Sequence, residues 1–251
     1  MKITRAVVPS LFTTLNVYCG FLSIVYASQM RIEMAAWFII LAGVFDTLDG
    51  LMARITRSSS QFGVELDSLS DVVSFGAAPS FLVWQVHLQT MGTWGLIIAA
   101  FPLVFGAIRL ARFNVQLVGF EKAHFSGMPI PIQAITLCAF LLQYYGEGAG
   151  LTGWPRDVVA PLTVVLGLLM VSRIKYDTMP KLTRKDIIAH PWKVVSFGVA
   201  GLLVIFSKGE LLFTILSAFI LFGVLRAGIR LLRHGPQPDA EEEPEPSSVD
   251  V

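Results

Sequence analysis

The chain has 251 residues, of which 54% are hydrophobic and only 15% are charged. Soluble domains are usually about 45–50% apolar and about 25% charged, so this composition excludes an ordinary soluble domain and indicates an integral membrane protein. The formal net charge is +1, and we expect no nucleic-acid partner. The two cysteines, Cys19 and Cys138, lie inside apolar stretches, so we expect no disulfide framework and no cysteine-rich metal site.

Eight apolar segments approach the length of a membrane-spanning helix, since a hydrocarbon core of about 30 Å needs about 20 residues. They are residues 9–28, 33–53, 66–87, 93–111, 129–146, 157–174, 192–207 and 210–230. The first follows a basic N-terminus but lacks a convincing cleavage site, so we interpret it as a retained span and not as a signal peptide. We therefore predict an all-α, polytopic membrane protein of about eight transmembrane helices, with one transmembrane domain over residues 1–234.

The basic residues are unevenly distributed between the two sides of these spans. With the N-terminus in the cytoplasm, 16 of the 19 Lys and Arg residues fall on the cytoplasmic side, and only Arg31, Arg156 and Lys208 fall on the other. This asymmetry follows the positive-inside rule, so we expect both termini on the cytoplasmic face of the cell (inner) membrane. Residues 235–251 are rich in Pro and Glu, and we predict a disordered cytoplasmic tail there.

Four aspartates occupy the facing ends of the second and third predicted spans. Asp46 and Asp49 are three residues apart, and Asp67 and Asp71 are four apart, so each pair lies on one face of its helix. Because the two helices are antiparallel and joined by a short polar loop, we expect the pairs to converge at one membrane surface. Ionisable residues in a membrane are costly and usually functional.

Converging carboxylates repel one another unless a cation lies between them. Mg²⁺ and Mn²⁺ prefer carboxylate oxygens, and the cluster contains no His or Cys that would favour zinc. The alternative is a solvated loop in which the acids pair with Arg54 and Arg57; four acids at helical spacing make that interpretation the weaker one. Gly50, inside the second predicted span, admits two explanations, which are close helix packing and room for a nucleotide.

The region from Asp46 to Asp71 resembles a known family signature. It fits DxxDGxxARx8GxxxDxxxD at every fixed position, which is the motif of the CDP-alcohol phosphatidyltransferases. The resemblance implies that the first three aspartates bind one or two Mg²⁺ or Mn²⁺ ions that hold a CDP pyrophosphate. It implies that Asp71 is the catalytic base, with metal contact as an additional role. It further implies a homodimer and a CDP-lipid site that includes Gly50, Ala53, Arg54 and Gly63.

Segments outside the motif resemble the membrane-embedded phosphatidylserine synthases of this family. These segments are residues 9–24, 66–80, 106–115, 125–134 and 170–181. The resemblance implies CDP-diacylglycerol and L-serine as substrates, with phosphatidylserine and CMP as products. Arginine suits a carboxylate, so Arg112, with Arg109 and Asn114 nearby, is the predicted acceptor site, although positive-inside anchoring also explains these arginines. Thr13 and Asn16 either contact cytidine or phosphate, or form packing hydrogen bonds between helices.

Two other functions fit part of this pattern. The same chemistry could use another acceptor, namely glycerol 3-phosphate, inositol phosphate or choline. A cation transporter also uses carboxylates within the membrane. Transport sites, however, tend to lie near the bilayer midplane on broken helices, often in repeated halves, whereas these four aspartates cluster at one interface without a second copy of the motif.

Overall fold

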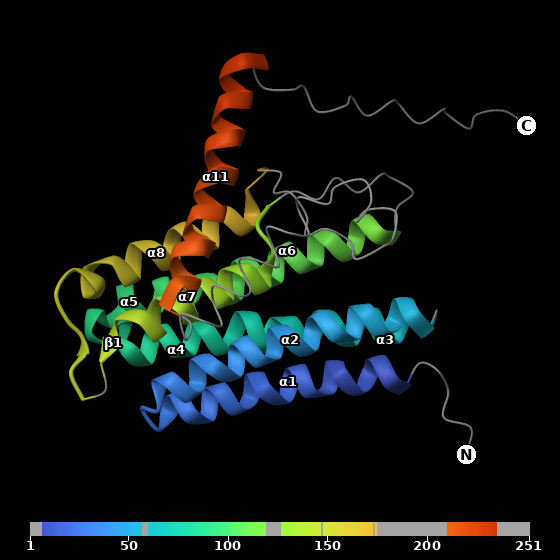
Figure 1. Cartoon of the computed structure of the whole chain (residues 1–251), viewed down its shortest axis with the longest axis horizontal. Helices are drawn as coiled ribbons and strands as arrows, with labels where there is room; N and C mark the ends of the chain where they lie inside the picture. Colours follow the sequence, from blue (N-terminus) through green and yellow to red (C-terminus); the bar gives the residue numbers. More distant parts are fainter. Residues whose placement is uncertain are drawn as a thin grey trace, which may run out of the picture.

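The computed structural model describes residues 7–56, 60–118, 127–146, 148–172, 174 and 210–234. These residues are almost entirely helical, and the strands among them are Tyr145–Gly146 (β1) and Gly150–Leu151 (β2), which pair antiparallel. The long helices lie against one another in a single bundle (Figure 1). The predicted all-α class is therefore confirmed.

Helices α1 (Val7–Ser28) and α2 (Ile32–Thr56) form an antiparallel hairpin along one side of the bundle (Figure 1). At the turn between them Met30 has a φ of 60°, which is uncommon for a residue other than glycine. The turn is fixed by side chains: Gln85 Nε2 donates to Met30 Sδ at 3.2 Å, and the Arg31 guanidinium lies 4.8 Å from the centroid of the Tyr26 ring. The hairpin thus fixes the position of the aspartates of α2 relative to α1.

The third helical segment consists of α3 (Gln61–Asp71), the π-helix η1 (Val72–Ala77) and α4 (Ala78–Val86). It begins earlier than the predicted residue 66, because Ser60 caps the polar first turn by accepting a hydrogen bond from Gly63 N at 3.0 Å. The π-helix follows directly after Asp71. Short π-helical turns inside longer helices are frequent at functional sites.

The predicted span 93–111 is two helices. After the short 3₁₀ turn η2 (Leu88–Met91), α5 (Gly92–Ala99) ends and α6 (Phe101–Val118) begins within two residues. Pro102 lies at the start of α6, where a missing N–H is tolerated, and the next amide, Leu103 N, donates to Ser80 Oγ at 3.1 Å. The packing between the third segment and α6 therefore helps to satisfy the backbone at this break.

Helix α7 (Ile130–Tyr144) lies at the centre of the bundle, and its Leu137 and Phe140 are fully buried. Helix α8 (Trp154–Val171) packs against α6 and α7. Helix α11 (Glu210–His234) joins the bundle through Phe213, whose ring lies 5.2 Å from that of Phe140, and then projects away from it (Figure 1). Much of α11 is therefore exposed.

Five helical segments of the described part are long and apolar enough to cross a membrane. They are Pro9–Ser28, Ile32–Thr56, Leu88–Val115, Trp154–Val171 and Leu211–Ile229. Large apolar side chains such as Trp94 and Phe222 are exposed on them, as expected where lipid covers the surface. The protein is a multi-pass membrane protein. The count of eight stays a prediction, since the predicted span 192–207 and the tail 235–251 lie outside the described residues.

Candidate functional site

Three of the four predicted aspartates lie together where α2 meets α3. One carboxylate oxygen from each of Asp46, Asp49 and Asp67 lies within 4.8 Å of the others. Asp49 is buried, and the other two are half-buried. Asp49 Oδ2 and Asp67 Oδ1 are shielded from solvent and have no hydrogen-bond partner among the described residues. Buried carboxylates are normally paired or bound to a metal, so these three fit a hard divalent cation.

Asp71 lies beside this group and not within it. Its side chain is only 8% exposed and contacts that of Asp46, while its Oδ1 accepts a hydrogen bond from Asn16 Nδ2 at 3.4 Å. The three-residue group contains Asp46, Asp49 and Asp67 but not Asp71. The geometry thus separates a set of three potential metal ligands from a fourth carboxylate held by an amide. This division suits a base better than a fourth ligand.

Helix α1 contacts both helices that carry the aspartates. The Thr13 hydroxyl lies 3.1 Å from the Pro9 carbonyl oxygen and also contacts the Asp49 side chain, so its single proton can be donated to either. Two serines of the third segment, which sequence reasoning missed, bind the α1 backbone. Ser70 Oγ donates to the Thr13 carbonyl at 3.1 Å, and Ser74 Oγ donates to the Asn16 carbonyl at 2.9 Å. Their i, i+4 spacing was the available signal.

The three predicted acceptor residues on α6 have different surroundings. Arg109 interacts electrostatically with Asp71, and its Nε is buried without a hydrogen-bond partner among the described residues. Arg112 Nη1 instead donates to the Val171 carbonyl at the end of α8, at 3.4 Å. Asn114 Nδ2 donates to Ser68 Oγ at 2.9 Å. Arg109 therefore combines an electrostatic interaction with the aspartate cluster and a buried Nε–H that is open to a ligand.

The two glycines of the motif differ in the space beside them. A Cβ added to Gly50 would meet nothing within 4 Å, whereas one added to Gly63 would lie 3.2 Å from Ser60 Oγ. Close packing therefore does not account for Gly50 among the described residues, and the open space favours the nucleotide explanation. Arg54 is exposed and its Nε donates to the Gly50 carbonyl at 2.9 Å. Ala53 is half-buried on the same turn of α2.

The Ser126–Pro131 region, part of a segment used for the acceptor prediction, is described only from Gly127 onward. Gly127 has a φ of 87°, and a Cβ there would collide with the Met170 carbonyl. Gly127 N donates to the Ile174 carbonyl at 2.9 Å, and Met128 N donates to the Leu169 carbonyl at 3.0 Å. The chain before α7 is thus attached to the end of α8, near the end of α6 that carries Arg112.

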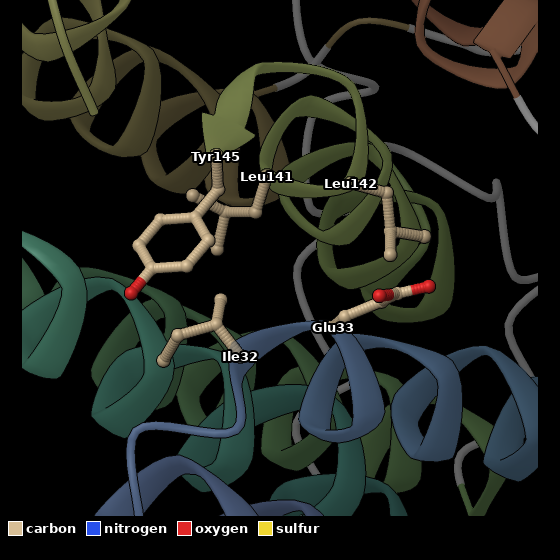
Figure 2. Close-up of a pocket in the computed structure, with 5 residues that line it drawn as sticks. All are labelled: Ile32, Glu33, Leu141, Leu142 and Tyr145. Atoms are coloured by element: carbon tan, nitrogen blue, oxygen red, sulfur yellow. The ribbon is translucent and has the colours of Figure 1, made fainter. Parts of the chain in front are cut away.

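A small pocket lies at the other end of α2, away from the aspartates (Figure 2). Polar and apolar atoms both line it, and Glu33 contributes a carboxylate at its edge (Figure 2). The lining residues are Ile32, Glu33, Leu141, Leu142 and Tyr145. Because Ile32 and Glu33 open α2 and the aspartates lie in its second half, this pocket is separate from the carboxylate site.

Comparison with known proteins agrees with the motif. Residues 6–171 match the family model of the CDP-alcohol phosphatidyltransferases. A CDP-diacylglycerol–serine O-phosphatidyltransferase of Helicobacter pylori is 34% identical over 223 residues, which cover 87% of this chain and 90% of the relative. One from Bacillus subtilis is 32% identical, covering 74% and 98%, and an archaetidylserine synthase of Methanothermobacter thermautotrophicus is 35% identical, covering 70% and 72%. The chain belongs to the CDP-alcohol phosphatidyltransferase family.

Proposed function

We propose that the protein transfers a phosphatidyl group from CDP-diacylglycerol to the hydroxyl of L-serine, forming phosphatidylserine and CMP. The observation that carries the proposal is the convergence of three carboxylates from α2 and α3 beside a fourth, Asp71, that is held by an amide. The activities for which the relatives are named supply the donor and the acceptor. The enzyme would thus act in phospholipid biosynthesis.

Asp46, Asp49 and Asp67 would hold one or two Mg²⁺ or Mn²⁺ ions. All their available ligand atoms are carboxylate oxygens, which these hard cations prefer, and the atoms are close enough to share an ion. A bound ion would neutralise charge on the phosphate oxygens and leaving group and would orient the donor. The family is divalent-metal dependent, which agrees with this assignment.

The donor headgroup would lie against α2. The open space at Gly50, together with the small Ala53 and Gly63, would admit cytidine, and the exposed Arg54 would lie near the phosphates. Thr13 and Asn16, predicted as further donor contacts, direct their side chains toward Asp49 and Asp71. Their contacts support a role in holding the carboxylates more directly than a contact with the cytidine of the donor.

The proton of the serine hydroxyl would be taken by Asp71. A carboxylate within hydrogen-bond reach of the acceptor can act as a general base. The serine oxygen then forms a bond to the lipid-side phosphorus, the bond from that phosphorus to the bridging oxygen breaks, and CMP leaves with the electron pair. No side chain needs to form a covalent intermediate.

Arg109 would bind the carboxylate of serine. Its partly buried guanidinium interacts electrostatically with Asp71 and has an Nε–H without a partner in the described part of the chain. A guanidinium binds a carboxylate through parallel hydrogen bonds. Arg112 and Asn114 have contacts with Val171 and Ser68, so we place them around this site as supports for α6.

The location that fits these roles is the cytoplasmic face of the inner membrane. In the predicted eight-span topology most Lys and Arg residues fall on the side that carries the aspartates, as on a cytoplasmic face. An interfacial site also lets the acyl chains of the donor remain in lipid. Both termini, including the tail 235–251, would lie on that side. A homodimer is part of the proposal by family resemblance.

An acceptor panel tests the function. The purified protein would be given labelled CDP-diacylglycerol and Mg²⁺ or Mn²⁺, with L-serine, glycerol 3-phosphate, inositol phosphate or choline in separate reactions. We expect a new labelled phospholipid with serine and none with the other alcohols. A product with another alcohol and none with serine would overturn the acceptor assignment while leaving the family chemistry intact.

A further inference from the structure

Asn16 carries a polar atom that the proposed mechanism does not use. Its side chain is 0% exposed, and its Nδ2 donates to Asp71 Oδ1 at 3.4 Å. Its Oδ1 is buried and has no hydrogen-bond partner among the described residues. A buried amide oxygen without a donor is unfavourable, so a group that supplies a proton donor would be bound strongly here.

The orientation of this amide follows from its partner. A carboxylate has acceptors and no donor, so the amide nitrogen must face Asp71 and the oxygen must point away from it. The two ends of the Asn16 side chain therefore have different tasks. The nitrogen holds the base, and the oxygen, on the same rigid planar group, offers an acceptor within a few ångströms of the base.

The backbone beneath Asn16 is fixed. Ser74 Oγ donates to the Asn16 carbonyl at 2.9 Å, and Ser70 Oγ donates to the Thr13 carbonyl at 3.1 Å. One turn further along α1, Gly20 packs directly onto Ser74, and a Cβ there would lie 2.7 Å from Ser74 Cα. These contacts fix the position of Asn16 along α1 relative to Asp71. The amide is therefore preorganised, and binding a ligand costs little conformational entropy.

We propose that Asn16 Oδ1 accepts a hydrogen bond from the ammonium group of the acceptor. This inference rests on the proposed function and adds a determinant of its specificity. In serine the hydroxyl and the ammonium are on adjacent carbons, so a hydroxyl at Asp71 brings the ammonium to the neighbouring amide oxygen. With Arg109 on the carboxylate, serine is read at three points, which is the minimum needed to distinguish its enantiomers.

A neutral hydrogen-bond acceptor such as an amide oxygen suits this position better than another carboxylate. Four carboxylates already surround the site, and a fifth would compete for the divalent cation and repel the donor phosphates. An alcohol whose neighbouring group has no N–H or O–H, such as choline with its quaternary ammonium, cannot satisfy the buried oxygen and is disfavoured for that reason. The amide thus provides selectivity without added charge.

Two analogues of serine test the assignment. Ethanolamine lacks the carboxylate, and 3-hydroxypropanoate lacks the ammonium; each is measured as a competitor of L-serine with the purified protein, CDP-diacylglycerol and Mn²⁺. The variant Asn16→Leu removes the amide at nearly constant volume. We expect it to raise the KM for serine and the inhibition constant of ethanolamine about 10- to 100-fold, as loss of a charged hydrogen bond does. The inhibition constant of 3-hydroxypropanoate should stay within about twofold of the wild-type value.

Asn16→Asp and Ser23→Ala serve as companion variants. Asn16→Asp keeps an acceptor for the ammonium but cannot donate to Asp71 and adds a fifth carboxylate. It should therefore lower kcat and weaken metal and CDP-diacylglycerol binding, without the loss of ethanolamine binding expected for Asn16→Leu. Ser23 is also fully buried on α1, and its hydroxyl has no partner in the described part. It lies two turns from Asn16, so Ser23→Ala should change the inhibition constant of neither competitor. If Asn16→Leu does not fold, the wild type still decides, since it must bind serine at least about tenfold more tightly than 3-hydroxypropanoate.

Three results would overturn the inference. Equal effects of Asn16→Leu on both competitors would show that the residue only positions Asp71. A rise confined to the KM for CDP-diacylglycerol would make it a donor contact. Equal wild-type affinities for serine and 3-hydroxypropanoate would mean that the ammonium is not recognised. A wild-type protein that does not use serine at all is a different result, because it removes the proposed function itself.

Discussion

Gly20 and Ser74 mark a point of very close approach between α1 and the π-helix that follows Asp71: a Cβ on Gly20 would lie 2.7 Å from Ser74 Cα. Backbone lines one side of this contact, so the clash cannot be relieved by rotating a flexible side chain. The same crossing brings the Ser74 hydroxyl to the Asn16 carbonyl. The register of α1 against Asp71 thus depends on the absence of a side chain at residue 20.

We expect Gly20→Ala to lower the free energy of unfolding by about 1–3 kcal/mol, the usual cost of overpacking, and to reduce activity by shifting Asn16 from Asp71. Thermal unfolding in detergent micelles and steady-state kinetics measure the two effects. Gly228→Ala is the matched control, because a Cβ there meets nothing within 4 Å. Equal behaviour of the two variants would contradict the close crossing.

Gly50 is expected to behave in the opposite way. It lies inside α2 with open space beside it, so Gly50→Ala should preserve stability or raise it by up to about 1 kcal/mol through helix propensity. If the space admits the nucleotide, the same change should raise the KM for CDP-diacylglycerol by about tenfold. The unfolding midpoint and the KM for CDP-diacylglycerol should therefore change independently of each other. A loss of stability without a change in KM would assign Gly50 to packing.

The carboxylate group predicts a strict metal requirement. Chelation with EDTA should abolish turnover, and Mg²⁺ or Mn²⁺ should restore it in the wild type. Asp67→Asn weakens the charge of the site and should lower kcat by about 100-fold or more, a loss comparable to removing a main electrostatic contact with the transition state, while raising the metal concentration needed for half-maximal rate. Full activity in EDTA would refute the role of Asp46, Asp49 and Asp67.

Substitutions of the two arginines of α6 should have different effects on serine binding. Arg109→Gln removes a positive charge that interacts with Asp71. It should raise the KM for serine and the inhibition constant of 3-hydroxypropanoate by about 10-fold or more, with little change in the inhibition constant of ethanolamine. Arg112→Gln loses a contact with the Val171 carbonyl and should act mainly on thermal stability. If Arg112→Gln lowered serine affinity more than Arg109→Gln does, Arg112 would be the residue that binds the serine carboxylate.

Much of the fold is predictable from hydropathy, because a bilayer demands long apolar helices. The ends of α1 and α2 fall close to the predicted spans. The early start of α3, the π-helix after Asp71 and the break at Ala100 were missed. They depend on local contacts, namely the Ser60 cap, the packing of Ser74 on α1 and the bond between Ser80 and Leu103, and hydropathy does not contain that information.

The site shows the same division. Helical spacing brought the aspartates together correctly, since i, i+3 and i, i+4 neighbours share a face on any helix. Spacing could not separate Asp71 from the other three, because that depends on which side chain of α1 reaches it. It could not assign different contacts to Arg109 and Arg112 either, since both are near the same end of α6 and the bond of Arg112 depends on the position of Val171 on α8.

The most direct test of the proposed reaction measures both of its products together. Purified protein in mixed micelles would receive CDP-diacylglycerol, Mn²⁺ and labelled L-serine, and CMP and lipid-bound label would be quantified together. We expect equimolar CMP and phosphatidylserine from the wild type. For Asp71→Asn we expect a rate lower by about 10²- to 10⁴-fold, with CDP-diacylglycerol binding retained. CMP release without label in lipid, or undiminished turnover by Asp71→Asn, would contradict the proposed reaction.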